Sequence, residues 1–197
     1  TGVQTCALPI YGVAIYSTGW RVAMIAVLPV MGIATAVISV SGAAYGAKAY
    51  EKVSISHLYS VKIGFIFELI IAIGIFVFAP QIAAVFSRAE AASHLEPGLI
   101  QFFRVMSIYY PFISLGMLSS SLFQGIGKGV NSFIATVLRT LIFTLLFILV
   151  FAITLDGGLV GIWWGIVVAN VISSFLVFFW VRRYVKKMMK TVIPVGA

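Results

Sequence analysis

Long apolar stretches that are almost free of charge are the feature that most limits how this chain can fold. The longest uncharged run extends over residues 22–47. A helix needs about 20 mostly apolar residues to cross a bilayer. Charged residues make up only 9% of the 197-residue chain and hydrophobic residues 62%, whereas soluble domains carry about 25% and 45–50%. The sequence therefore predicts an all-α integral membrane protein and excludes soluble and disulfide-rich folds.

Five spanning helices are expected, with bounds set by charged and turn residues. They cover about residues 11–47, 56–79, 99–124, 130–154 and 158–181. Pro29 lies inside the first span and Pro111 inside the third. No polar turn flanks Pro29, so one kinked helix is favoured over two short ones. Residues 81–98 predict a short interfacial helix, and Gly127 and Gly129 are expected to take positive φ in the next turn.

Basic residues gather on one predicted side of the membrane and explain the net charge of +8. They follow the first, third and fifth spans: Lys48, Lys52, Lys62, Lys128, Arg182, Arg183, Lys186, Lys187 and Lys190. The positive-inside rule makes this side cytoplasmic. We therefore expect a multi-pass plasma-membrane protein with residues 182–197 as a basic cytoplasmic tail. The first span then begins outside, and the basic charge does not indicate a nucleic-acid partner.

The first ten residues, TGVQTCALPI, back-translate to a run that looks like a sequencing-library adapter read in frame. We expect residues 1–10 to be an artefact rather than a natural loop, with the gene cut upstream of Tyr11. The single cysteine, Cys6, then carries no redox or metal information. Finding the same ten codons in both the raw reads and a fresh amplification of the locus would refute this hypothesis.

Ionisable residues inside the spans are functional candidates, because a charge at mid-bilayer costs about 2.5 to 3.5 kcal/mol. Glu68 is the only carboxylate well inside a predicted span. It suits a site for a coupling ion or a substrate counter-ion, or equally an ion pair with Arg139 or Arg104. Arg139 itself is favoured as a lock between helices. Arg104 lies near a span end, where its side chain can reach the membrane interface.

Hydroxyl and aromatic side chains form a ladder around Pro111 in the third span. The candidates for lining a cavity are Tyr109, Tyr110, Ser114 and Gln124, together with Asn170 in the fifth span. Tyrosine faces attract cations, so such a cavity suits amphipathic organic cations. Ordinary hydrogen bonding between helices explains the ladder equally well.

Groups for catalysis or metal binding are missing from the sequence. His57 and His94 are isolated and are expected to be solvated in or near loops. No metalloprotease motif, nucleophile elbow or Cys/His cluster is present. We therefore predict no enzyme activity, no catalytic residue, no metal site and no cofactor.

Three segments resemble multidrug and toxic compound extrusion (MATE) transporters. Residues 21–53, with a proline, a Gly-Ile and a small-residue stretch before a basic loop, are similar to the eighth helix of that family. Residues 119–146, with Phe-Gln-Gly, Gly-Lys and an arginine downstream, resemble the turn between its tenth and eleventh helices. Residues 155–174 resemble the start of the twelfth helix. The likeness covers nearly all of residues 11–190.

The resemblance implies twelve helices in two six-helix lobes that export amphipathic, often cationic, drugs in exchange for Na⁺ or H⁺. This chain would then hold helices eight to twelve, five of the six helices of the C-terminal lobe, and its partner would be the missing N-terminal lobe of the same polypeptide. The topology derived from the basic residues agrees with that position. Residues 105–124, the counterpart of the tenth helix, lack the carboxylate of some bacterial members, which leaves Glu68 as the coupling candidate.

Two other functions remain open at this stage. A flippase for lipid-linked precursors, from the same superfamily, would be expected to have a more basic central cavity. A non-transporting membrane assembly subunit would explain the missing catalytic groups, but it leaves Glu68 and the proline-containing spans unexplained.

Overall fold

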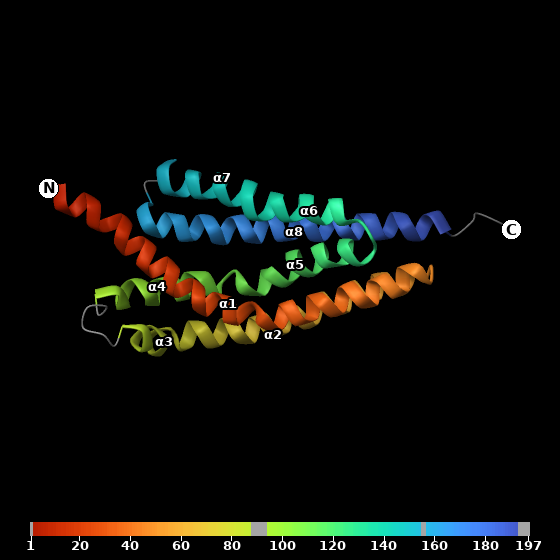
Figure 1. Ribbon diagram of the computed structural model, residues 1–197, viewed down its shortest axis with the longest axis horizontal. Coiled ribbons are helices and arrows are strands. Elements are labelled where there is room, and N and C mark those ends of the chain that lie inside the picture. Colours follow the sequence, from red (N-terminus) through yellow and green to blue (C-terminus); the bar gives the residue numbers. More distant parts are fainter. Residues whose placement is uncertain (1, 88–93, 155–156, 193–197) are drawn as a thin grey trace.

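Long helices lying side by side make up the computed structural model, which describes residues 2–87, 94–154 and 157–192 (Figure 1). The elements are α1 (Gly2–Gly46), α2 (Tyr50–Val77), α3 (Ala79–Phe86), α4 (Glu96–Ser107), α5 (Tyr110–Gly125), α6 (Gly129–Val137), η2 (Leu138–Phe143), α7 (Thr144–Leu149), η3 (Val150–Thr154) and α8 (Gly158–Val192). The described residues form no strand, which confirms the predicted all-α class. Parts of four segments discussed above lie outside the described residues: residue 1 of the first ten, residues 88–93 of the segment 81–98, residues 155–156 of the segment 155–174, and residues 193–197 of the predicted tail.

Four helices are long and apolar enough to cross a membrane, and the bent pair α4–α5 gives a fifth span if it is counted as one. Large apolar side chains such as Ile25, Ile70 and Val130 point outward and are more than half exposed. A helix that is apolar on all sides is typical of a membrane span. The chain is therefore a multi-pass membrane protein, as predicted.

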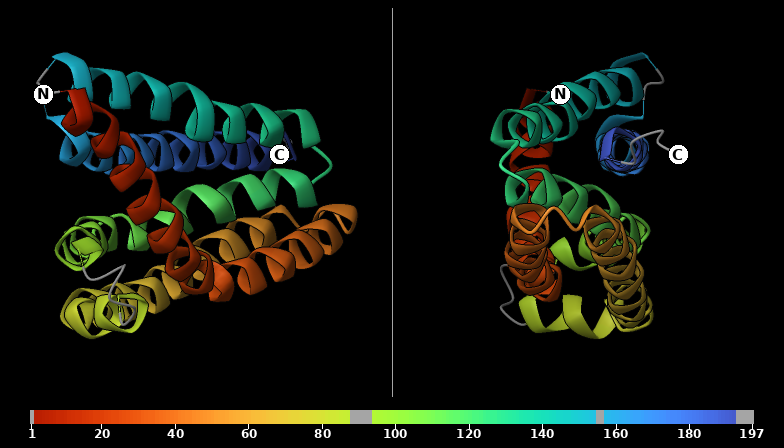
Figure 2. Two further views of the ribbon diagram at one scale, coloured as in Figure 1. Left: turned by 60° about the vertical axis from the view of Figure 1, so that its left-hand side comes forward. Right: turned by 90° about the vertical axis from the view of Figure 1, so that its right-hand side faces the viewer.

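Helix α1 continues unbroken past Pro29, so the predicted single helix is confirmed. Figure 1 and Figure 2 show that its direction changes about midway along its length. A proline removes one backbone donor and crowds the carbonyl one turn earlier, which bends a helix without ending it when the surroundings support both halves.

The third span differs from the prediction of one helix over residues 99–124. The helix breaks between Ser107 and Tyr110, and α4 and α5 meet at an angle of 52°. Pro111 lies in the first turn of α5, where its missing N–H needs no partner. Because Pro111 cannot donate to the carbonyl one turn back, it ends α4 and begins α5.

Two helix boundaries also lie beyond the predicted ones. Helix α2 begins at Tyr50 rather than near residue 56, so Lys52 is also a helical residue. Helix α8 continues to Val192, and the first part of the predicted basic tail is therefore helix. A short helix, α3, covers Ala79–Phe86 at the start of the segment 81–98, for which an interfacial helix was predicted.

In the turn between α5 and α6, only one of the two glycines predicted to have positive φ has it. Gly127 takes φ +73°, as expected, whereas Gly129 is not among the residues with positive φ and begins α6. Glycine adopts this left-handed conformation without steric cost. One left-handed residue is therefore enough to reverse the chain here.

Helix α5 lies at the centre of the bundle, beside α1, α2 and α8 (Figure 2). Glycines allow close contact at two helix interfaces of the bundle, one between α1 and α5 and one between α8 and the segment that follows α7. A Cβ atom on Gly42 of α1 would lie 3.1 Å from the carbonyl oxygen of Gly125. On α8, a Cβ atom on Gly161 would lie 2.5 Å from the Phe151 oxygen, in the segment that follows α7. Small residues let helices approach at backbone distance in lipid.

Candidate functional site

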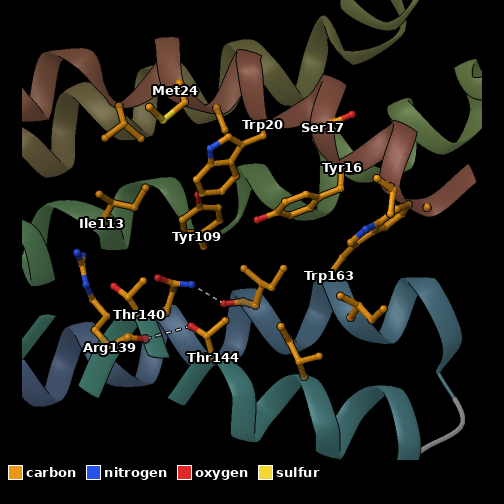
Figure 3. Close-up of a pocket in the computed structure, with 18 of the residues that line it drawn as sticks. Tyr16, Ser17, Trp20, Met24, Tyr109, Ile113, Arg139, Thr140, Thr144 and Trp163 are labelled. Atoms are coloured by element: carbon orange, nitrogen blue, oxygen red, sulfur yellow. Dashed lines mark hydrogen bonds between the residues drawn. The ribbon is translucent and has the colours of Figure 1, made fainter. Parts of the chain in front are cut away.

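A cavity of about 1070 Å³ opens between α1, α5, α8 and the helical stretch from η2 to α7 (Figure 3). Its walls are mainly apolar side chains, with aromatic rings and a few polar groups among them. The ring-bearing and polar lining residues are Tyr16, Ser17, Trp20, Tyr109, Arg139, Thr140, Thr144, Trp163 and Asn170. A concave apolar cavity of this size with few polar groups is typical of a small-molecule site.

The aromatic part of the cavity is held by ring contacts. Tyr16 and Trp20 stack with ring centroids 5.6 Å apart. Trp163, which is fully buried, meets Phe102 edge to face at 5.5 Å. Phe102 also contacts Tyr16, at 6.2 Å. One aromatic cluster thus links α1, α4 and α8 and fixes the wall of the cavity.

The polar end of the cavity is built around Arg139, which lies in the π-helical segment η2. The wider turn lets the Thr144 hydroxyl donate to the carbonyl of Arg139 at 3.1 Å. Nε of Arg139 has no hydrogen-bond partner among the described residues. Short π segments occur often at functional sites, because they change the direction in which a side chain points.

Glu68 lies away from this cavity, on the buried face of α2. It is fully buried, and neither carboxylate oxygen has a hydrogen-bond partner in the described part of the chain. Gly64, one turn earlier, packs against Ser114 and Leu118 of the antiparallel helix α5. Glu68 interacts electrostatically with Tyr110, whose hydroxyl is also buried and unpartnered. Glu68 and Tyr110 are thus two buried polar groups without hydrogen-bond partners among the described residues, on the adjacent helices α2 and α5.

The ion pair suggested between Glu68 and an arginine is not formed. Arg139 lines the cavity, and Arg104 is exposed, with its guanidinium 5.7 Å from the Phe76 ring centroid. Glu68 has no hydrogen-bond partner in the described part of the chain, but Tyr109, which lines the cavity, is close enough to interact electrostatically with both Glu68 and Arg139. The positions of these residues in the sequence did not indicate which of them would lie close together in the bundle.

Only two of the five predicted cavity residues line the cavity, namely Tyr109 and Asn170. Tyr110 and Ser114 are fully buried, and the Ser114 hydroxyl donates to the Pro111 carbonyl at 2.8 Å. Gln124 is exposed and donates to the Ser132 hydroxyl at 3.1 Å. The sequence reasoning missed Tyr16, Trp20 and Trp163, for which the interfacial preference of aromatic rings was the only available signal.

The prediction that His57 is solvated is wrong. His57 is fully buried, and its Nε2 lies 3.0 Å from the Ser119 hydroxyl of α5. Its ring lies 5.5 Å from the Phe178 ring of α8. One turn before it, Ser54 accepts a hydrogen bond of 2.9 Å from Arg182. His57 is buried because it lies on the face of α2 that packs against α5 and α8. His94 is exposed, as predicted.

We expect His57→Ala to lower the free energy of unfolding by about 2 to 4 kcal/mol, because it leaves a cavity and an unpaired Ser119 hydroxyl. Thermal unfolding of the purified protein in detergent measures this effect. His94→Ala is the matched control and should leave the midpoint unchanged. Equal midpoints for the two variants would contradict a structural role for His57.

The described residues contain no group of three His, Cys, Asp or Glu side chains placed to hold a metal ion. The cavity therefore offers rings, hydroxyls, an amide and one guanidinium. Such groups bind and orient a ligand, and they supply neither a nucleophile with its base nor a paired acid and base.

Comparison with known proteins gives a consistent result. A family model described as MatE matches residues 5–150. The inward-facing and outward-facing structures of a multidrug resistance MATE family transporter of the MOP superfamily are each 37% identical, with a TM-score of 0.88, and matches to them cover 91% of this chain. A MOP superfamily transporter from Pyrococcus furiosus, described as having a binding pocket of reverse polarity, is also 37% identical, with a TM-score of 0.88 over 91% of this chain.

The chain spans about two fifths of the length of these transporters, since the matches cover 41%, 40% and 40% of them. No curated protein matches the chain. The family match extends over most of the sequence, and the helices superpose on solved transporters of that family at more than one-third identity. The chain therefore belongs to the MatE family of membrane transporters.

Proposed function

We propose that this chain is part of a secondary transporter that exports amphipathic organic compounds in exchange for Na⁺ or H⁺. The observation that carries the proposal is the large open cavity, built on a lobe that matches MATE transporters. The aromatic wall suits the apolar body of such a compound, and the arginine, hydroxyls and amide at the other end suit its polar group. Organic cations, the substrates implied by the family, are attracted by the rings and repelled by Arg139.

The proposed transporter works by alternating access, in which the binding site opens first to one side of the membrane and then to the other. The chain matches the inward-facing and the outward-facing transporter with the same TM-score, 0.88. A lobe that fits both states equally well supports rigid-body movement of one lobe against another around a central site. The proposal therefore includes a second lobe, formed by the rest of the same polypeptide, as the partner.

Ion coupling is assigned to Glu68. A buried carboxylate without a partner suits a site that takes up and releases a proton or a Na⁺ ion, because either one offsets the cost of its burial. The neighbouring Tyr110 hydroxyl offers a further oxygen. We place the basic end of α8 in the cytoplasm, following the positive-inside rule.

The proposal predicts gradient-driven efflux. The full-length polypeptide containing these residues is reconstituted into vesicles loaded with a fluorescent amphipathic dye, and an inward Na⁺ or proton gradient is imposed. We expect dye efflux that stops when an ionophore collapses the gradient. Equal leakage with and without the gradient would instead favour a non-transporting assembly subunit.

The same vesicles test the flippase alternative. A flippase would move a fluorescent lipid-linked precursor between leaflets and leave the soluble dye inside. The single arginine in the cavity gives less positive charge than a diphosphate-linked lipid would require.

A further inference from the structure

The cavity carries one formal charge, and that charge is positive. Arg139 is the only Asp, Glu, Lys or Arg among the described residues that line it. We propose that the cavity binds an amphipathic anion, with the ligand's carboxylate, sulfonate or phosphate at Arg139 and its apolar body against the aromatic rings. The inference deepens the proposed function by naming the substrate class, and it is opposite in charge to the cations that the family resemblance implied.

The first argument is the electrostatic state of Arg139. Its Nε has no hydrogen-bond partner among the described residues, and the one electrostatic partner identified for it there is the phenol of Tyr109, which also lines the cavity. A guanidinium stays charged in proteins. Holding this charge in an apolar environment is costly unless a partner offsets it. An acidic head group supplies that partner and has the geometry that the guanidinium fork prefers.

The second argument is that the surroundings leave room for the guanidinium. Gly116 of α5 lies beneath it, because a Cβ atom at Gly116 would stand 3.1 Å from Nη1 and 3.1 Å from Cδ of Arg139. The same Cβ atom would stand 2.7 Å from the Ser174 hydroxyl, which is buried and has no partner in the described part of the chain. The Arg139 side chain and the Ser174 hydroxyl thus both lie beside Gly116, and Nε of Arg139 and the hydroxyl of Ser174 are without hydrogen-bond partners among the described residues.

The third argument is the distance along the cavity between its one charged group and the rings of Tyr16 and Trp163. Figure 3 shows Arg139 and Thr140 together at one end, with Tyr16 and Trp163 towards the other. Asn170 uses one amide hydrogen to donate to the Ile166 carbonyl at 2.8 Å, which leaves a second donor. A ligand with an acidic head and an apolar tail matches this order of groups, and the volume of about 1070 Å³ accommodates it.

The test compares two probes that differ only in head-group charge. Dansyl-labelled undecanoate and its trimethylammonium counterpart are titrated against the full-length polypeptide in phosphatidylcholine nanodiscs, and dansyl emission gives the dissociation constants. We expect the carboxylate probe to bind at least tenfold more tightly. Arg139→Gln should weaken the carboxylate probe at least tenfold and leave the cationic probe unchanged or tighter, whereas Arg139→Lys should keep most of the preference.

The matched control is Arg104→Gln, which removes an exposed arginine outside the cavity and should change neither constant. Two results would overturn the inference: an unchanged affinity of Arg139→Gln for the carboxylate probe, or an equal loss for both probes. The second result would mean that Arg139 is a structural lock, or that another part of the polypeptide neutralises it.

Two further measurements are needed. The first distinguishes a lipid head group from a free anion as the ligand, and the second distinguishes failure of the anion site from failure of the proposed function. If phosphatidylglycerol in the nanodiscs competes with the carboxylate probe in the wild type but not in Arg139→Gln, the anion site accepts lipid head groups; without competition it selects free anions. In reconstituted vesicles, Arg139-dependent binding without gradient-driven efflux of either probe would refute the proposed function and keep the anion site. Gradient-driven efflux of the cationic probe that is the same in the wild type and in Arg139→Gln would keep the proposed function and refute the anion site.

Discussion

Replacing Glu68 with glutamine is expected to abolish gradient-driven efflux and, at the same time, to stabilise the folded protein. Glutamine keeps the shape of the side chain, but it cannot exchange a proton or present a charged oxygen to Na⁺. The wild-type carboxylate is fully buried and both of its oxygens lack partners among the described residues. Replacing a buried unpartnered carboxylate with a neutral amide removes the cost of burying a charge.

The two effects are measured separately. Efflux from reconstituted vesicles should fall to the level of protein-free vesicles. Thermal unfolding should shift upward by about 2 to 4 °C for each kcal/mol gained, and a gain of about 1 to 3 kcal/mol is expected. A substitution that abolishes activity but raises stability is typical of a residue that is retained for function at a cost in stability.

The control for Glu68 is Glu51→Gln on the same helix. Glu51 lies in the first turn of α2 and is exposed, so its replacement should leave both efflux and the unfolding midpoint near the wild-type values. If Glu68→Gln transports like the wild type, the coupling role is refuted. If it loses both transport and stability, Glu68 is a structural residue.

Replacing Gly125 with leucine is expected to prevent α1 and α5 from packing. A Cβ atom at Gly125 would overlap the Ser41 hydroxyl and stand 2.6 Å from the carbonyl oxygen of Ile38. Ser41 is fully buried, and its hydroxyl donates to Val37, so it has nowhere to move. Extra methylenes in a packed core typically cost about 1 to 3 kcal/mol, and occasionally more. Here the obstacle is backbone, and we expect more than about 3 kcal/mol.

The matched control is Gly129→Leu, four residues further along the chain. No atom lies within 4 Å of a Cβ atom built at Gly129, and its φ is not positive. Size-exclusion chromatography in detergent, followed by thermal unfolding, compares the two variants. Gly125→Leu should aggregate or unfold at much lower temperature, while Gly129→Leu should elute as the wild type does. Similar profiles would show that the helices can separate at little cost.

The cavity could be predicted from the sequence only in part. Tyr109 and Asn170 were found because polar groups inside an apolar span are conspicuous. Tyr16, Trp20 and Trp163 line the same cavity, but an aromatic residue in a membrane helix is equally suited to lipid, to the interface or to the bundle interior. In water, apolar residues mark the inner face of a helix; in lipid, both faces are apolar and the mark is lost.

The sequence by itself determined the properties that depend on local composition. Apolar length marked the membrane spans, which are four single helices and, if it is counted as one span, the bent pair α4–α5, and Gly127 marked a turn that needs positive φ. Tertiary structure alone decided that His57 is buried against Ser119, that Glu68 has no hydrogen-bond partner in the described part of the chain, and that Arg139 lines one cavity with rings from α1 and α8. The physical reason is that hydropathy acts on each segment separately, whereas these contacts join helices distant in sequence through packing at glycines.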